Sequence, residues 1–157
     1  MKKEADENEK LIVENRKARF EYFVLEKYEA GIVLTGTEVK SLRLGRVNVV
    51  DAHAAMTKGE LWLYNLNIQK FDKGNRFNHE PTRPRKLLLH KYELRRLVQG
   101  VQEKGLTIIP LKFYFTGGKV KVEIGLCKGK KVYDKRDTLH EKDAKREVER
   151  ALKHSVQ

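Results

Sequence analysis

Two runs of alternating apolar residues, joined by a pair of glycines, constrain the fold of this chain more than any other feature. Every second position is apolar on both sides of Gly117-Gly118, namely Ile109, Leu111, Phe113 and Phe115 before it and Val120, Val122, Ile124 and Leu126 after it. A two-residue glycine turn between such segments is typical of an antiparallel β-hairpin with one buried face. We therefore expect these side chains to share that face, with Lys119 and Lys121 pointing the other way. Pro110 has no N–H to donate, which predicts an edge position or a bulge there.

Other stretches rich in β-branched and aromatic residues predict further strands. Residues 20–34 predict one long strand, and residues 47–56 and 61–66 predict a second hairpin that turns at residues 57–59. Residues 67–86 are polar and irregular and predict a long loop.

Two helices are expected between these strands. Thr35 and Glu38 have the spacing of a capping box and predict a short helix over residues 35–45. Apolar residues at helical spacing predict a second helix over residues 91–104, with Gly105 following as its C-terminal cap. The predicted fold is mainly β, an OB-like antiparallel β-barrel with two packed helices. Such barrels commonly bind oligonucleotides, although a fold does not prove a function.

Changes in composition divide the chain into three regions. Residues 1–14 are polar and of mixed charge, and we expect a flexible head. Residues 15–128 hold most of the apolar periodicity and form the predicted barrel, which is an ordinary size for one domain. Residues 129–157 are charged and nearly free of large apolar residues, and we expect a basic C-terminal tail.

The charge balance indicates a polyanionic partner. The 34 Lys and Arg against 22 Asp and Glu give a formal net charge of +12, and each base set against a phosphate releases condensed counterions. Nucleic acid is the partner favoured first and an anionic membrane surface second. A thermophilic surface would raise both signs of charge together, which fits the imbalance less well. Composition alone does not distinguish RNA from DNA.

The sequence offers no constellation that would support catalysis or metal binding. Cys127 is the only cysteine, so disulfides and multi-cysteine zinc sites are excluded. Ser41 and Ser155 lie outside any nucleophile-elbow pattern, and the histidines lack paired ligand spacing. The N-terminal residues resemble no secretory signal, and no apolar run reaches the length of a membrane helix. We expect a cytoplasmic protein, not an enzyme, with no cofactor and no metal.

One dense basic cluster falls in residues 83–96, where Glu93 is the only acid. It begins with Arg83, Arg85 and Lys86 and continues on one face of the predicted helix. We interpret it as a surface for backbone phosphates. The alternative is an ordinary solvated face.

The tail has an apolar stripe at helical spacing, but a thin one. Its members are Ala144, Val148, Ala151 and Leu152, and Thr138 with Glu141 predicts a capping box ahead of them. So little apolar area would not hold a helix against the barrel. We therefore expect a tail that is disordered or frayed when free and helical on a polyanionic partner, with a permanently folded helix as the alternative.

Several long motifs, in one order, carry a family resemblance. They are Asn15-Arg16-Lys17-Ala18-Arg19, Tyr28-Glu29-Ala30-Gly31-Ile32-Val33-Leu34, Gly36-Thr37-Glu38-Val39-Lys40-Ser41-Leu42-Arg43, Pro81-Thr82-Arg83-Pro84-Arg85-Lys86-Leu87-Leu88-Leu89-His90 and Gly129-Lys130-Lys131-Val132-Tyr133-Asp134-Lys135-Arg136. Over about residues 15–150 the chain resembles the small protein B family, the bacterial SsrA-binding proteins.

The resemblance implies ribosome rescue by trans-translation. The family's barrel binds the tRNA-like domain of transfer-messenger RNA and, with elongation factor Tu, delivers it to stalled ribosomes, where the tail becomes helical in the vacant message channel of the small subunit. The RNA-binding positions implied here are Glu29 in the Tyr-Glu-Ala-Gly motif, Leu88 in the leucine triplet and Lys121 in the motif Lys121-Val122-Glu123-Ile124-Gly125. Arg19, Lys40, Arg83, Arg85 and Lys86 are added from the basic motifs. The ribosome-binding tail positions are Lys130, Lys131, Asp134, Lys135 and Arg136.

The chain departs from the family pattern at two places, and the residues by themselves allow alternative interpretations. Phe20 stands where relatives often carry His, and the tail lacks a tryptophan that some relatives have. By periodicity alone Leu88, in an apolar triplet, favours plain core packing. The alternative function is a general single-stranded RNA- or DNA-binding OB module. We expect a monomer.

Overall fold

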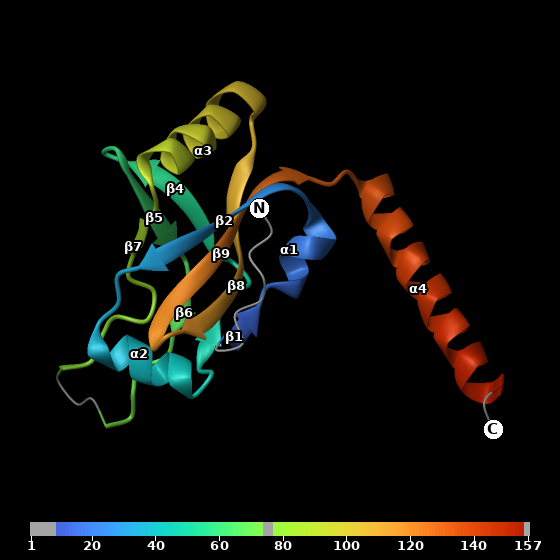
Figure 1. Cartoon of the computed structure of the whole chain (residues 1–157), viewed down its shortest axis with the longest axis horizontal. Coiled ribbons are helices and arrows are strands. Elements are labelled where there is room, and N and C mark those ends of the chain that lie inside the picture. The colour runs from blue at the N-terminus through green and yellow to red at the C-terminus, as the bar shows by residue number, and fades with distance from the viewer. Residues whose placement is uncertain (1–8, 74–76, 156–157) are drawn as a thin grey trace.

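The computed structural model describes residues 9–73 and 77–155. The chain folds as a β-barrel with peripheral helices (Figure 1). The strands, in chain order, are β1 (Lys10–Glu14), β2 (Tyr22–Ile32), β3 (Val47–Asn48), β4 (His53–Thr57), β5 (Glu60–Tyr64), β6 (Asn67–Ile68), β7 (Arg85–Leu88), β8 (Thr107–Thr116) and β9 (Lys119–Gly129). The helices are α1 (Arg16–Glu21), α2 (Gly36–Arg43), α3 (Lys91–Lys104) and α4 (Val132–Ser155).

Seven strands form one antiparallel sheet that closes on itself. Their order is β1-β8-β4-β5-β7-β2-β9, and β9 also pairs with β8, which completes the ring. Closure leaves β1 as an added strand on the outside of β8. The expected mainly β, OB-like barrel is confirmed. Pairing of β8 with β9 closes the sheet, so that β9 has no exposed strand edge there.

The main core fills the barrel and is built from one face of each strand. Phe113, Val122 and Ile124 are fully enclosed there together with Leu63, each contributing roughly 1.5–3 kcal/mol through burial. α3 closes one end of the barrel through Leu97, which is also fully buried. The expected bounds of α3 and its Gly105 cap, in the left-handed conformation, are confirmed.

The hairpin of β8 and β9 forms as expected, but not all its apolar residues share a face. Gly117 and Gly118 turn the chain with positive φ, and the register shifts between Pro110 and Lys112, so the predicted bulge is confirmed. The extra residue at this bulge reverses which side chains of β8 point into the barrel and which point out of it. Ile109 and Leu111 therefore pack outside the barrel, in a second cluster, and the expectation that they join Phe113 inside is wrong.

That second cluster is covered by α1, which the sequence analysis did not foresee. Residues 20–34 were expected to form one strand, but residues 16–21 are helical and β2 begins at Tyr22. Asn15 explains the change: its Oδ1 accepts from Ala18 N at 3.1 Å, and its Nδ2 donates to the carbonyl of Pro110 at 2.9 Å. The bulge thus fixes the N-terminal cap of the helix.

The structure also moves the expected boundaries at both ends of the barrel. β1 lies within residues 10–14, which were expected to be a flexible head, and it pairs with β8. β9 continues to Gly129, opposite Tyr22. Residues 1–8 of the expected head lie outside the described residues.

Two further expectations need correction in the middle of the chain. The expected strand over residues 47–56 is divided into β3 and β4, whereas the turn at residues 57–59 is confirmed by positive φ at Lys58 and Gly59. Residues 67–86 are not a simple loop, because they contain β6 and the start of β7.

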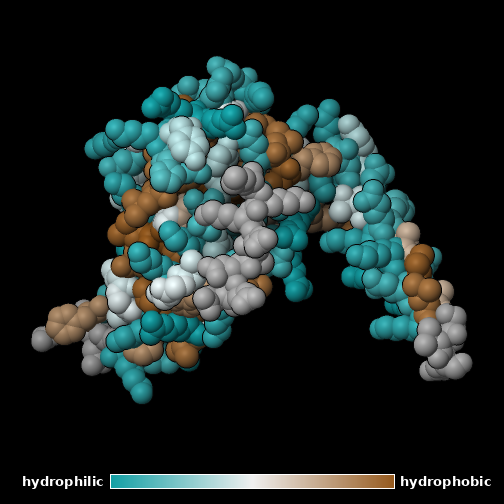
Figure 2. Space-filling model, viewed as in Figure 1, coloured by the Kyte–Doolittle hydropathy of each residue, from teal (hydrophilic) through white to brown (hydrophobic). Residues whose placement is uncertain are grey.

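The tail is a continuous helix that projects away from the barrel (Figure 1). We expected a disordered or frayed tail, with a permanently folded helix as the alternative. The helix begins at Val132, ahead of the expected capping box at Thr138. The expectation that the apolar stripe does not dock on the barrel is confirmed, since Val148 and Leu152 stay 59% and 61% exposed. Figure 2 shows the helix surface as mostly hydrophilic, with apolar colour towards its end.

Candidate nucleic-acid interface

Strand register brings the three positions for which the resemblance implies RNA binding onto one face of the sheet. Leu88 in β7 lies opposite Gly31 in β2, Gly31 lies opposite Lys121 in β9, and Lys121 lies opposite Tyr114 in β8. Residues directly opposite one another across a sheet point to the same side. We call this line of four residues the outer row.

The outer row faces away from the core. The neighbours that precede or follow its members, Leu87, Ala30, Val122 and Phe113, are all enclosed in the barrel, and successive side chains point to opposite faces. Glu29 stands two residues before Gly31 in β2 and shares the outer face. Its side chain is exposed, so Glu29, Leu88 and Lys121 are presented together on the outside.

Leu88 is the clearest case in which tertiary structure decides between two interpretations. It is 50% exposed, so the core packing that periodicity favoured is wrong. Its side chain leans across Gly31: a Cβ built on Gly31 would lie 3.3 Å from the Cβ of Leu88. An exposed leucine beside a residue without a side chain offers an apolar surface to a base or a sugar.

Tyr114 completes the outer row and contacts Glu29 directly. Its hydroxyl donates to Oε2 of Glu29, while the Nζ of Lys112 lies 5.2 Å from the centre of its ring. Burial and the contact with Glu29 raise the pKa of the Tyr114 phenol far above its usual value. The hydroxyl therefore stays protonated and remains a donor.

β7 divides the basic cluster between the two faces of the sheet. Lys86 points outward with Leu88 and lies 3.1 Å from Oε1 of Glu60. Arg85 points inward with Leu87 and is fully buried. The prediction that Arg85 contacts RNA phosphates is therefore wrong, because alternation along an unforeseen strand places its guanidinium inside the protein.

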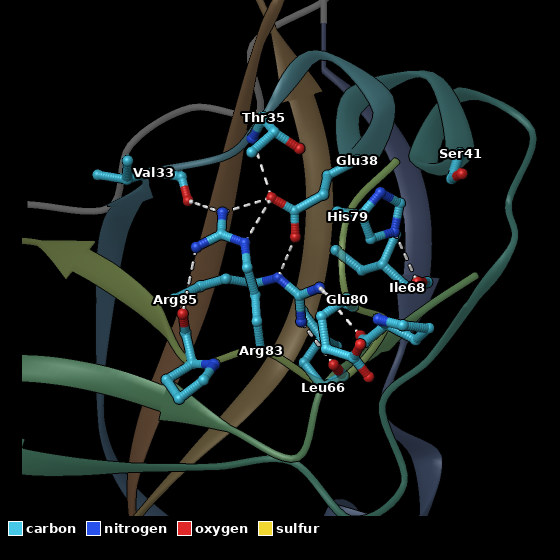
Figure 3. A network of polar contacts seen from close by, with 12 residues as sticks. Val33, Thr35, Glu38, Ser41, Leu66, Ile68, His79, Glu80, Arg83 and Arg85 are labelled. Atoms are coloured by element: carbon cyan, nitrogen blue, oxygen red, sulfur yellow. Dashed lines mark hydrogen bonds and ion pairs between the residues drawn. The ribbon is translucent and has the colours of Figure 1, made fainter. Parts of the chain in front are cut away.

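Figure 3 shows where that guanidinium binds. Glu38, in the first turn of α2, is fully buried and accepts hydrogen bonds from Arg85, from Arg83 and, at 2.9 Å, from the backbone N–H of Thr35. Arg85 also donates to the carbonyl of Leu66 at 2.6 Å. Burial raises the pKa of Glu38, but the three donors outweigh it and hold that pKa below its ordinary value.

The same network ties α2 to the loop before β7. Arg83 is partly exposed, and its Nη2 also donates to the carbonyl of Val33 at 3.3 Å. His79 is buried. Its Nε2 donates to the carbonyl of Ile68 at 2.8 Å, and its Nδ1 lies 2.9 Å from the hydroxyl of Thr37. These contacts fix the segment from which Lys86 and Leu88 are presented.

Two other predicted RNA-binding residues lie apart from the outer row. Lys40 is exposed on α2, with its Nζ 5.4 Å from the ring centre of Phe71. Arg19 is exposed on α1 and pairs with Glu14 at 2.8 Å. Both stay proposals as RNA contacts, since they are accessible but belong to other elements.

Lys130 joins the barrel to the tail helix. Its Nζ donates to Thr138 at 2.8 Å and to the carbonyl of Arg19 at 3.3 Å, and it lies 5.0 Å from the ring centre of Phe23. Its backbone N–H donates to the carbonyl of Glu21 at 2.8 Å. The residue predicted to contact the ribosome thus makes contacts within the chain.

The other tail positions lie at the start of α4, with Lys131 just before the helix and Asp134, Lys135 and Arg136 within it. Oδ2 of Asp134 accepts from the backbone N–H of Lys131 at 3.1 Å, so this carboxylate caps the start of the helix. Lys131 and Arg136 are exposed, and Lys135 is half-buried. Asp134 therefore has a structural role in addition to any contact with a partner.

Gly31 and Tyr114 are the residues of the outer row that the sequence analysis missed. The position of Tyr114 could have been predicted from the turn at Gly117-Gly118. A two-residue turn sets Thr116 opposite Lys119 and hence Tyr114 opposite Lys121. Gly31 could not be placed opposite Leu88, because β7 was not foreseen.

Three further features concern metal ligation, the single cysteine and the membrane. Within residues 9–73 and 77–155, no three His, Cys, Asp or Glu side chains gather in a way that could hold a metal ion. Cys127 is buried in the second cluster, and burial raises its pKa to about 11. In the same part of the chain, no helix has the length and apolar character needed to span a membrane.

Comparison with known proteins identifies the family. The family model described as "SmpB protein" matches residues 12–154. The chain belongs to the SmpB family. An SsrA-binding protein of Carboxydothermus hydrogenoformans is 61% identical over 145 residues, which cover 92% of this chain and 97% of that relative. An SsrA-binding protein of Shouchella clausii is 57% identical over 147 residues, 94% of each chain.

A solved structure extends this SmpB relationship to three dimensions. The match has a TM-score of 0.65 and 55% identity, and it covers 76% of this chain and 85% of the other. That structure is described as "tmRNA-SmpB: a journey to the center of the bacterial ribosome". The resemblance read from the sequence motifs is confirmed.

Proposed function

We propose that this SmpB chain is an RNA-binding adaptor that is not an enzyme. It binds the tRNA-like domain of transfer-messenger RNA and brings it to stalled ribosomes for trans-translation, which rescues the ribosome and tags the incomplete peptide. The observation that carries the proposal is the placement of Glu29, Leu88 and Lys121. These residues come from three motifs far apart in the sequence, yet strand register sets them on one exposed face.

The chemistry of the outer face suits a folded RNA. Lys121 supplies a charge for a phosphate, Leu88 an apolar surface for a base or sugar, and Glu29 an acceptor for a 2′-hydroxyl or a base amino group. A general single-strand binder would rely on a row of stacking aromatics along a basic groove. The outer row has one aromatic residue, Tyr114, and it is 4% exposed.

The tail contributes a separate function in this proposal. α4 extends from the barrel with its side chains largely exposed, and the resemblance assigns such a helix to the vacant message channel of the small ribosomal subunit. Elongation factor Tu joins through the RNA complex. We further propose that the protein works as a monomer in the cytoplasm.

Competition binding tests the substrate class. A labelled tRNA-like domain is bound to the protein and displaced either by the same unlabelled RNA or by poly-uridine. The folded RNA should compete far better. Equal displacement by both would favour the general single-strand binder.

Substitution of Lys121 tests the face itself. Lys121→Ala should weaken binding several-fold and reduce the slope of log affinity against log salt by about 1, because one phosphate contact is lost. Lys104→Ala removes an equal charge from the exposed end of α3 and serves as the control. A salt slope that is flat for the wild-type protein, or identical losses for the two variants, would contradict the proposed interface.

A further inference from the structure

We infer that Tyr114 is a positioning residue for RNA binding, whose hydroxyl fixes the carboxylate of Glu29 on the outer face. The inference rests on the proposed function, in which Glu29 contacts the RNA. It adds a residue from a different strand, which the family motifs quoted above do not contain.

The sheet geometry places Tyr114 where this role is possible. Tyr114 lies opposite Lys121, Lys121 lies opposite Gly31, and Glu29 is two residues from Gly31 on the same side. Tyr114 and Glu29 are therefore diagonal neighbours across β9, within the reach of a long side chain. The hydroxyl of Tyr114 spans that diagonal and donates to Oε2 of Glu29.

An anionic residue in an RNA interface needs such control. A glutamate whose carboxylate swings freely repels phosphates and loses rotamer entropy when it is finally ordered by a ligand. A donor that holds one oxygen orders the group before binding, and a carboxylate still has several lone pairs with which to accept from RNA. Orientation makes Glu29 a specific acceptor instead of a diffuse negative charge.

Tyr114 is itself held firmly, which it must be to orient another side chain. Its side chain is 4% exposed, and the Nζ of Lys112 lies 5.2 Å from its ring centre. The Nζ of Lys112 in turn lies 3.2 Å from Oε1 of Glu9 and 3.7 Å from Oε2 of Glu123. The ring of Tyr114 is buried beside Lys112, and its hydroxyl contacts Glu29.

Removal of that hydroxyl alone tests the inference. Tyr114→Phe keeps the ring and should lower the affinity for the tRNA-like domain by about five- to tenfold, the size expected for one oriented hydrogen bond. The salt slope should stay unchanged, because no charge is removed. Tyr28→Phe is the matched control: its hydroxyl also donates to a glutamate of β2, Glu26, but not to Glu29.

A double-mutant cycle separates positioning from packing. If Tyr114 acts through Glu29, the variant with both Tyr114→Phe and Glu29→Ala should bind no more weakly than Glu29→Ala alone. Thermal unfolding of each variant, followed by circular dichroism, should give midpoints close to that of the wild-type protein. Additive losses in the cycle would overturn the inference, because they would show that Tyr114 acts independently of Glu29.

The remaining outcomes distinguish the inference from the proposed function. If Glu29→Ala weakens binding but Tyr114→Phe does not, the positioning role of Tyr114 is refuted and the proposed interface stands. If Glu29→Ala and Lys121→Ala both leave binding unchanged, the interface itself is wrong and the inference is refuted with it.

Discussion

Arg85 donates from Nε to the carboxylate of Glu38 while both side chains are completely enclosed by the protein. Arg85 belongs to β7 and Glu38 to the first turn of α2. The pair therefore holds α2 against the strand that presents Leu88. Every buried side-chain nitrogen and oxygen of the described residues has a partner. The pair is therefore a satisfied internal network, although its residues belong to motifs that also suggested RNA binding.

Breaking this pair should destabilise the fold strongly. Arg85→Met leaves the buried Glu38 with fewer donors and should lower the free energy of unfolding by about 3 kcal/mol or more, measured by urea denaturation. Lys86→Met, at the next position, breaks only the exposed pair with Glu60 and should cost under about 1 kcal/mol. Similar losses in the two variants would contradict the assignment of Arg85 to the interior.

The depressed pKa of Glu38 predicts how stability depends on pH. The pKa of the folded state lies below the ordinary value of 4.5, so ionised Glu38 contributes stability that is fully present above that value. The contribution should be lost as the pH falls through the lower, folded pKa. Glu38→Gln should lack this part of the acid dependence, which urea denaturation between pH 7 and pH 3 would show. An unchanged acid profile in the variant would contradict the prediction.

The absence of a side chain at Gly31 should matter for binding more than for folding. In Gly31→Ala the new Cβ would lie 3.3 Å from the Cβ of Leu88, so Leu88 must shift by a few tenths of an ångström. We expect a loss of RNA affinity of a few-fold, with the free energy of unfolding changed by less than about 1 kcal/mol.

Gly36→Ala gives the matched control for this substitution. A Cβ at Gly36 meets no atom within 4 Å, so neither binding nor stability should fall. Filter-binding titrations and urea denaturation of both variants provide the measurements. Equal affinity of the Gly31 and Gly36 variants would show that the position of Leu88 is unimportant.

The tail should be separable from the barrel at a boundary that the structure defines. A chain that ends after Lys131 keeps the contacts of Lys130 with Arg19 and Glu21 but lacks α4. It should fold, bind the tRNA-like domain with nearly wild-type affinity and fail in a trans-translation assay on stalled ribosomes.

A full-length control separates the helix from its first turn. Lys135→Ala with Arg136→Ala retains α4, together with Asp134, which caps it, and should reduce rescue without changing RNA binding. Full activity of the shortened chain in rescue would refute this division between barrel and tail.

The local parts of this fold are readable from the sequence because short-range geometry determines them. The two glycines at residues 117–118 allow the positive φ angles of a tight turn, and that turn sets the register that places Tyr114 opposite Lys121. The bounds of α3 follow from helical periodicity and a left-handed cap at Gly105. Family motifs likewise indicate Glu29, Leu88 and Lys121 without any knowledge of the fold.

Long-range packing decided the remainder. β7 has four residues and little alternation of its own, and pairing with β5 and β2 makes it a strand. The sequence alone could not show that Arg85 points inward while Lys86 points outward. The bulge after Pro110 similarly reverses the faces of Ile109 and Leu111.

The sequence by itself determined the barrel class, the hairpin turn, the central helix and the family. The tertiary structure decided which charged residues are exposed and which residues share the outer row. The physical reason is that a strand's two faces are chemically equivalent until its neighbours bury one of them. A shift of one residue therefore changes whether an arginine faces RNA or the core.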